Sequence, residues 1–303
     1  MSKYNIYKNI SPNIFRGYDI RAVYGQDLNE DIAYTIGLGF GSYIQGKGYT
    51  KCLVGHDNRT SSEPLSDALI EGITSTGVDV VFLGLCTTPM YYYGQKFLGI
   101  DPGVMITASH NPKEYNGFKI AFDDFGNACG QMIQDFRVFI EEGNFKTGEG
   151  KVSTYDIKDE YLKAIKESID LGDRKIKVVV DTANGTASII AKEVYEMFDN
   201  VELVPLYIDS NPEFPNHHPD PSVEANNADL KAKVLETGAD LGIGIDGDGD
   251  RVGVIDENGN MIFIDFYAII IWRDIMSKVS NKHALFDVKC SKSLADEVEK
   301  LGG

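Results

Sequence analysis

The 303-residue sequence has few cysteines, a single tryptophan and no long apolar run. Its longest apolar run, residues 266–272, is far shorter than the roughly 20 residues that span a bilayer. The first residues also lack the apolar core of a signal peptide. The cysteines form no C-x-x-C pair, which fits a reducing compartment and argues against a disulfide framework; they are Cys52, Cys86, Cys129 and Cys290. We therefore expect a cytoplasmic protein with no membrane partner.

Positive charge is scarce. The chain has 29 basic residues against 46 acidic ones, a formal net charge of -17. This balance argues against a nucleic-acid binder, but it does not exclude an anionic small substrate held in a local basic cleft. With 43% hydrophobic and 25% charged residues, the composition also excludes a disordered chain.

Short strand-like apolar runs alternate with helical stretches, which predicts an α/β fold of consecutive βαβ-type domains with mixed sheets sandwiched by helices. Residues 1–150 make the first domain, which closes at a polar, Gly-rich stretch, and residues 151–256 make the second. Residues 257–303 hold the end of a hairpin, one helix, a strand at 283–288 and the start of another helix. Such a piece is too small to cover its own apolar surface, so we expect an incomplete third domain.

Three aspartates, Asp246, Asp248 and Asp250, follow an apolar strand in the motif IDGDGDR. Alternate residues of an extended segment project to one side, and the intervening glycines permit a tight turn. Converging carboxylates repel one another unless a divalent cation neutralises them, and oxygen ligands suit Mg²⁺. A calcium-binding EF-hand is disfavoured, because Arg251 stands where that loop needs glycine. A solvated acidic turn is the other alternative to a magnesium site.

A second motif, TASHNPKEYNGFK, spans residues 107–119 between two predicted strands. Ser109 lies there between the small Ala108 and His110, so it is accessible and close to a group that can accept its proton. The alternative is a simple turn built from Asn-Pro and Asn-Gly.

Together these motifs resemble those of the α-D-phosphohexomutases, the family of phosphoglucomutase, phosphomannomutase and phosphoglucosamine mutase. The resemblance covers essentially the whole chain, and FRGYDIR, FPNHHPDP and FDVKC are most similar to the bacterial phosphomannomutase/phosphoglucomutase branch. It implies an intramolecular phosphotransferase that interconverts hexose 1-phosphate and hexose 6-phosphate through a phosphoserine and a bisphosphorylated sugar. It also implies Mg²⁺ as cofactor, and glucose 1,6-bisphosphate or mannose 1,6-bisphosphate as activator and intermediate.

The resemblance assigns roles to individual residues. Ser109 would carry the phosphoryl group and bind Mg²⁺ together with Asp246, Asp248 and Asp250. Three positively charged residues would surround the transferring phosphate, and His110 would act in acid/base chemistry or positioning. Two further residues would line the substrate site. The basic residues are Arg21, Lys119 and Arg251, and the substrate-site residues are Tyr18 and Lys289.

The chain departs from the family pattern in two ways. His56 and Asn58 stand where the family commonly has Arg and Gly, so neither receives a role. Family members have four domains, whereas this sequence ends part-way through the third. We therefore expect an N-terminal portion with impaired turnover, whose partners are a phosphorylated hexose and the missing domains in trans.

Other interpretations stay open or are disfavoured. The adjacent His217 and His218 are interpreted as structural, because neighbours in an extended loop point to opposite sides. The alternatives to an enzyme are a shortened, non-catalytic metal- or phosphosugar-binding module and one half of a split mutase. A phosphatase of the haloacid dehalogenase type would need an early aspartate nucleophile, but DGDGD lies late in the chain.

Overall fold

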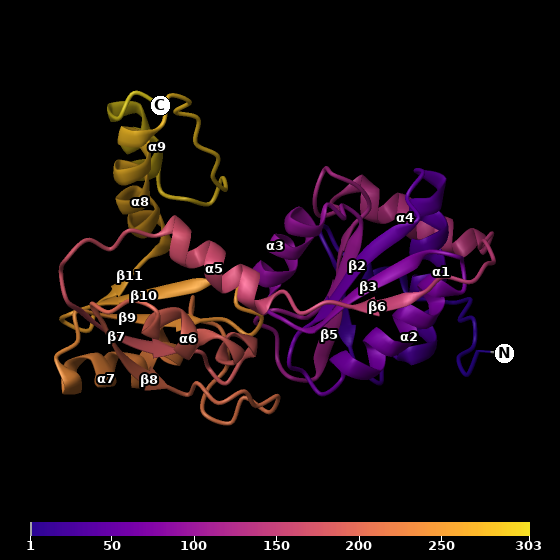
Figure 1. Ribbon diagram of the computed structural model, residues 1–303, viewed down its shortest axis with the longest axis horizontal. Coiled ribbons are helices and arrows are strands. Elements are labelled where there is room, and N and C mark those ends of the chain that lie inside the picture. The colour runs from indigo at the N-terminus through magenta and orange to yellow at the C-terminus, as the bar shows by residue number, and fades with distance from the viewer. Residues whose placement is uncertain (1) are drawn as a thin grey trace.

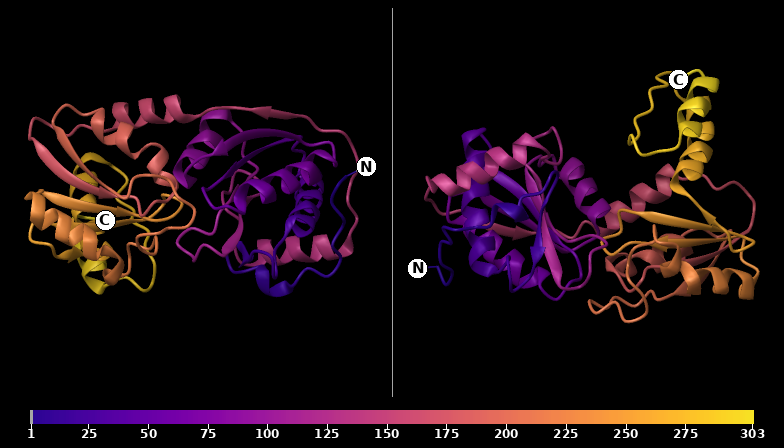
Figure 2. Two further views of the ribbon diagram at one scale, coloured as in Figure 1. Left: turned by 90° about the horizontal axis from the view of Figure 1, so that it is seen from below. Right: turned by 180° about the vertical axis from the view of Figure 1, so that it is seen from behind.

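The computed structural model describes residues 2–303 as two α/β units in a row, followed by two C-terminal helices (Figure 1). The chain begins on the outer side of the first unit, and its last helices stand on the second unit, away from the first, in all three directions of view (Figures 1 and 2). The predicted α/β fold with mixed sheets is confirmed.

The first unit holds a six-stranded sheet in the order β1-β5-β4-β2-β3-β6. Strands β4, β2, β3 and β6 run parallel to one another, whereas β5 is antiparallel to both β4 and β1. Its strands are β1 (Ile20–Val23), β2 (Lys51–His56), β3 (Asp79–Leu85), β4 (Gly103–Ile106), β5 (Tyr115–Ala121) and β6 (Val152–Thr154). Its helices are α1 (Glu30–Gly46), α2 (Ser62–Thr74), α3 (Thr88–Leu98) and α4 (Gln131–Glu142), after a short 3₁₀ turn at Pro12–Ile14.

Helices cover both faces of this sheet. Cys52 and Val54 of β2 join the core that α1, α2 and α4 enclose. Leu53, between them, joins a separate cluster with Tyr91 of α3. Successive strand residues point to opposite faces, so this alternation is what a sheet buried on both sides requires.

The second unit holds a five-stranded sheet in the order β11-β10-β9-β7-β8. Strand β7 is parallel to its neighbours β8 and β9, and β10 is antiparallel to β9 and β11. Its strands are β7 (Ile176–Asp181), β8 (Val201–Leu206), β9 (Leu241–Ile245), β10 (Val252–Asp256) and β11 (Met261–Ile262). Its helices are α5 (Lys158–Ser168), α6 (Ala191–Glu196) and α7 (Ala228–Thr237), with 3₁₀ turns at Thr186–Ile189 and Glu224–Asn227.

The two units share an apolar cluster. Ile157, at the start of α5, and Ile190, before α6, pack with Tyr91 of the first unit, and all three are buried. Contacts between α3 and α5 extend this junction. The loops that follow the strands of each unit are therefore held against one another by packing as well as by polar contacts.

The sheets extend past both expected boundaries. Strand β6 pairs with β3, so the first sheet runs beyond residue 150 to Thr154. Strand β11 pairs with β10, so the hairpin belongs wholly to the second sheet and crosses the expected boundary at residue 256. In each case a short edge strand gains backbone hydrogen bonds by joining the existing sheet, which a boundary drawn from composition does not register.

The C-terminal part contains α8 (Ile264–Lys278) and α9 (Lys292–Lys300), which pack together. The strand predicted at residues 283–288 is wrong, because this segment pairs with no strand within residues 2–303. Leu285 and Val288 are 96% and 97% exposed, so apolar side chains that suggested a buried strand face solvent. Among the described residues, no helix combines the length and apolar character needed to cross a bilayer.

Candidate active site

Two loops from different units meet at the candidate site. The serine loop, residues 107–114, leaves the carboxyl end of β4, and the acidic loop, residues 246–251, leaves the carboxyl end of β9. The Ser109 Oγ donates a hydrogen bond to the Asp246 Oδ2 at 2.8 Å, across 137 positions of sequence. The fold thus joins the two motifs that the sequence singled out.

Ser109 adopts a backbone conformation that is uncommon outside glycine, with φ of +52°. Its amide donates to the Thr107 Oγ1 at 2.8 Å. The residue is only 1% exposed, so the expectation of an accessible serine is wrong, because the acidic loop of the second unit packs over it. The Ser109 carbonyl approaches Gly247 so closely that a Cβ there would lie 2.5 Å from this oxygen. Gly247 is therefore needed for the serine and acidic loops to pack.

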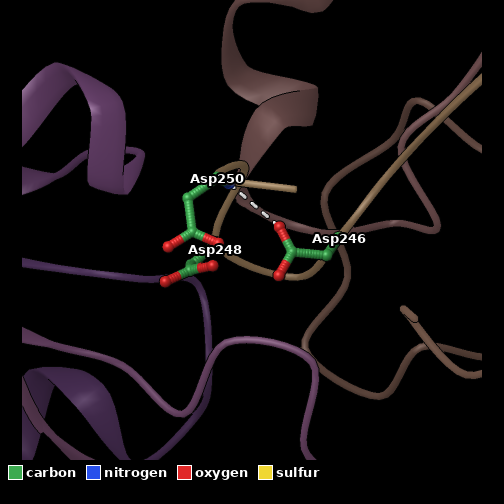
Figure 3. A group of neighbouring side chains, drawn as sticks. All are labelled: Asp246, Asp248 and Asp250. Carbon is green, nitrogen blue, oxygen red and sulfur yellow. Dashed lines mark hydrogen bonds between the residues drawn. The ribbon is translucent and has the colours of Figure 1, made fainter. Parts of the chain in front are cut away.

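Asp246 organises the acidic loop (Figure 3). Its Oδ1 accepts the backbone N–H groups of Gly249, Asp250 and Arg251 at 3.1, 2.9 and 3.0 Å. Gly249 has φ of +82°, which lets the chain turn back within these few residues. As a result Asp246, Asp248 and Asp250 each present a carboxylate oxygen within 4.8 Å of the other two.

Asp248 is fully buried and faces the first unit. Its Oδ2 accepts from the Lys119 Nζ at 2.7 Å and from the hydroxyls of Thr88 and Thr107 at 2.7 and 3.1 Å. Its Oδ1 is buried without a hydrogen-bond partner among the residues of the structure. An unpartnered, buried carboxylate oxygen beside two further carboxylates fits a hard divalent cation such as Mg²⁺.

The electrostatics of the acidic loop support this assignment. Burial, together with the charges of Asp248 and Asp250, raises the pKa of Asp246 well above its usual range. Burial also acts to raise the pKa of Asp248, but the charge and hydrogen bond of Lys119 outweigh it and lower this pKa. Lys119, which also bonds the Asp250 Oδ2 at 2.6 Å, has its own pKa raised by these carboxylates despite burial. One ammonium thus stabilises only part of the negative charge gathered here.

His110 and Arg251 flank the serine. The His110 Nδ1 lies 3.3 Å from the Ser109 Oγ and 2.6 Å from the Arg251 Nη1. Burial, and then the charge of Arg251, lower the pKa of His110. This lowered pKa favours the neutral form of the imidazole, which can accept a proton next to the serine oxygen.

Arg21 reaches the serine loop from β1. Its Nη1 donates to the Asn111 Oδ1 at 2.8 Å, and its Nη2 pairs with the buried carboxylate of Asp19 at 2.5 Å. Tyr18 is 62% exposed beside this pair. Lys289 lies in the C-terminal part, where it pairs with Asp287 at 3.6 Å, and no hydrogen bond or ion pair within residues 2–303 joins it to the site. The structure thus gathers all the named site residues except Tyr18 and Lys289. The roles assigned to all of these residues stay predictions.

Sequence reasoning missed the residues that connect the two loops. Thr88 and Thr107 bind Asp248 as described, and Asn58 donates through its Nδ2 to the Asn184 carbonyl at 2.9 Å and to the Ser210 Oγ at 3.0 Å. Asn58 therefore links the end of β2 to the second unit. The one available signal was a run of polar residues, DNRTSS, directly after a buried strand.

His217 uses both ring nitrogens within the protein. Its Nε2 lies 2.9 Å from the buried Asp181 Oδ2, and its Nδ1 lies 3.0 Å from the His218 carbonyl. Burial acts to lower the pKa of His217, but the carboxylate of Asp181 raises it overall. This agrees with the structural role that was expected for His217, whereas the same interpretation of His218 stays a prediction.

Comparison with known proteins gives a consistent result. Models of the phosphoglucomutase/phosphomannomutase alpha/beta/alpha domains I and II match residues 12–145 and 159–259. The chain is 40% identical over 293 residues to a phosphomannomutase/phosphoglucomutase of Pseudomonas putida, covering 96% of this chain and 62% of that protein. It is 36% identical to a phosphomannomutase of Methanocaldococcus jannaschii, covering 96% and 64% of the two chains.

A solved structure is similar over the same extent. The crystal structure of a phosphoglucomutase/phosphomannomutase family protein from Burkholderia thailandensis is 37% identical, with a TM-score of 0.92 over 97% of this chain and 65% of that one. The chain therefore spans less than two thirds of the length of these relatives.

Proposed function

Since the chain belongs to the phosphoglucomutase/phosphomannomutase family of α-D-phosphohexomutases, we propose that it carries the phosphoserine and metal half of a site that interconverts hexose 1-phosphate and hexose 6-phosphate. The observation that carries this proposal is the hydrogen bond of the Ser109 Oγ to Asp246, at the junction of two units and beside Lys119. The substrate is a phosphorylated hexose. We expect the reaction in the cytoplasm, where free cysteines stay reduced.

The chemistry follows from the geometry of Ser109. In the phosphorylated enzyme, the bond between phosphorus and the serine oxygen breaks as a sugar hydroxyl oxygen bonds to phosphorus. The hydroxyl proton passes to a base, and the departing serine oxygen takes up a proton. The resulting bisphosphorylated sugar then returns its other phosphoryl group to the serine oxygen. Glucose 1,6-bisphosphate or mannose 1,6-bisphosphate would load the serine in the same way. The neutral form of His110, whose Nδ1 lies 3.3 Å from the Ser109 Oγ, is placed to take a proton from the serine oxygen or return one to it.

Phosphoryl transfer depends on charge stabilisation and in-line positioning more than on covalent chemistry. Lys119 supplies a permanent positive charge beside the acidic loop, and Arg21 and Arg251 contact the serine loop at Asn111 and His110. Asp246, Asp248 and Asp250 would hold Mg²⁺, which supplies the additional charge that a phosphoserine of about -1.5 to -2 requires. Because the chain spans 62% of the Pseudomonas relative, full turnover would also draw on the part of that protein which this sequence does not match.

Intact mass spectrometry with phosphosite mapping tests the proposal, before and after incubation with glucose 1,6-bisphosphate and Mg²⁺. We expect one phosphoryl group on Ser109, absent from Ser109→Ala and strongly reduced in Asp248→Asn. The exposed Ser153→Ala variant serves as the matched control and should be modified like the wild type. A folded chain in which Ser109 stays unmodified under these conditions would overturn the catalytic proposal and leave a non-catalytic binding module.

A further inference from the structure

Arg59, directly after β2, uses every donor of its guanidinium group. The side chain is buried, yet each of its five N–H groups has an acceptor. The Nε pairs with the Asp57 Oδ2 at 3.1 Å. The other four donate to backbone carbonyls of the serine-loop region, those of Ser109 at 2.8 Å, Asn111 at 2.7 Å, Pro112 at 2.6 Å and Tyr115 at 3.2 Å.

These bonds converge from one side of the loop. Four carbonyl groups from seven consecutive residues point at one planar cation, so the chain from Ser109 to Tyr115 wraps around the guanidinium. A buried carbonyl group needs a hydrogen-bond donor, and only the planar guanidinium of arginine, with five N–H groups, reaches four carbonyls at once. A lysine ammonium, with three donors on one atom, cannot span the same set.

Neighbouring groups fix Arg59 in turn. The Asp57 Oδ1 accepts from the Arg59 amide at 3.0 Å and from the Ser62 Oγ at 2.5 Å, so the carboxylate is itself held. The ring of Phe214, from the second unit, lies 5.4 Å from the guanidinium. Arg59 is thus anchored to both units of the protein.

The constraint acts on the reacting oxygen. Ser109 has φ of +52°, and its carbonyl lies between the Arg59 guanidinium and the backbone of Gly247. Without these contacts the chain from Ser109 to Tyr115 could shift as a whole, and a shift of the Ser109 Cα would carry its side chain away from Asp246. The Arg59 contacts therefore determine where the Ser109 Oγ points.

We propose that Arg59 is the positioning residue for the phosphoryl-carrying serine: it touches no reacting atom, and it holds the serine loop in the conformation that aims the Ser109 Oγ at the acidic loop. The inference rests on the proposed function in that Ser109 is taken as the phosphorylated group. It separates the positioning of the nucleophile from the binding of the cation, which Asp246, Asp248 and Asp250 accomplish in the other unit.

The test compares Arg59→Lys and Arg59→Ala with the wild type, and with Arg137→Ala, which removes an exposed pair with Glu141 on α4. The rate of Ser109 phosphorylation by glucose 1,6-bisphosphate is expected to fall by about 10- to 100-fold in both Arg59 variants, the size of effect that misplacement of a reacting group produces. The affinity for Mn²⁺, used in place of Mg²⁺, should stay within about twofold, since the acidic loop is held by its own backbone bonds. Millimolar guanidinium, but not sodium chloride, should restore part of the rate of Arg59→Ala.

Hydrogen exchange supplies a readout that is independent of phosphorylation. The amides of Asn111 and Tyr115 bond to the carbonyls of Ala108 and Pro112, both at 3.0 Å, within the clamped loop. Their exchange should accelerate at least about tenfold in Arg59→Ala, since local opening no longer breaks the guanidinium contacts. Exchange in α1 and β7 should not change.

The outcomes separate the two proposals. If the wild type is never phosphorylated, the proposed function fails and the exchange data alone decide the positioning of the loop. If the wild type is phosphorylated and Arg59→Lys matches its rate, or the loop amides of Arg59→Ala keep their protection, the positioning role is overturned. Weakened Mn²⁺ binding or global loss of protection in Arg59→Ala also overturns it, because Arg59 would then support the fold as a whole.

Discussion

Replacing Lys119 by methionine should make the stability of the protein depend on divalent cations. Lys119 is the only ion-pair partner of Asp248 within residues 2–303, at 2.7 Å, and it also binds Asp250 at 2.6 Å. Methionine keeps an unbranched chain of similar length but removes the charge. Three carboxylates, two of them fully buried, would then face one another, and the one remaining ion-pair partner among the described residues would be Arg251, whose Nε lies 3.8 Å from the Asp250 Oδ1.

The expected magnitude follows from burial. Removing one partner of a buried ion pair costs about 3–5 kcal/mol, because the other charge stays buried without compensation. The lower end applies, since the hydroxyls of Thr88 and Thr107 still donate to Asp248 and the Asp250 side chain is 26% exposed. We therefore expect the free energy of unfolding in EDTA to fall by about 3 kcal/mol in Lys119→Met. A cation at 100 times its Kd returns about 2.7 kcal/mol, so Mg²⁺ should close most of the gap to the metal-free wild type.

Urea unfolding in EDTA and in Mg²⁺ measures both effects. Lys47→Met is the matched control, because Lys47 pairs with Asp123 at 2.6 Å on the surface, with 36% of its side chain exposed. Its loss should not exceed about 1 kcal/mol and should be the same with and without Mg²⁺. The view that these carboxylates need a cation would be refuted by either of two results. One is that Lys119→Met, compared with the metal-free wild type, loses as much free energy of unfolding in Mg²⁺ as in EDTA, and the other is that it loses none in EDTA.

Three further results are expected. Gly247→Ala places a Cβ 2.5 Å from the Ser109 carbonyl oxygen and should lower the free energy of unfolding by about 1–3 kcal/mol and abolish phosphorylation, whereas Gly46→Ala, in open space at the end of α1, should be neutral in denaturant titrations. The pKa of His217 is raised, so its stabilising contribution is complete below pH 6.5 and is lost as the pH rises through the raised pKa. When the midpoint of urea unfolding is measured against pH, this pH-dependent contribution should be absent from His217→Gln. Limited proteolysis followed by mass spectrometry should find the first cuts in residues 279–291, which lack helix and strand; an earlier cut in the serine loop would contradict its clamping.

Apolar patterning predicted a strand correctly where a partner strand lies beside the segment. The apolar strand expected directly before Asp246 is β9, Leu241–Ile245. Periodicity failed at residues 283–288, where the apolar pattern is present but no partner strand lies beside it among the described residues. A strand forms only when a second segment pairs with it, and the composition of one segment does not show whether such a partner is present.

The acidic loop was predictable because its signal lies in side-chain charge. Three carboxylates at alternate positions repel one another whatever surrounds them, so the sequence alone indicates a cation site. The structure brings their oxygens within 4.8 Å of one another. The partner of that loop was predictable only through the family resemblance. Nothing local to Ser109 indicates that its oxygen meets a carboxylate 137 positions away.

The residues that hold the site together left no such signal. Arg59 acts on carbonyl groups, which every residue carries, so its four backbone acceptors cannot be distinguished in the sequence from any others. Asn58 received no role because the family commonly has glycine there, yet its amide bridges to the Asn184 carbonyl and the Ser210 hydroxyl of the second unit. A glycine could offer only its backbone N–H to this junction, which here donates to the Thr186 Oγ1 at 3.1 Å. The side chain of Asn58 therefore adds interunit contacts that a resemblance built on shared residues does not contain.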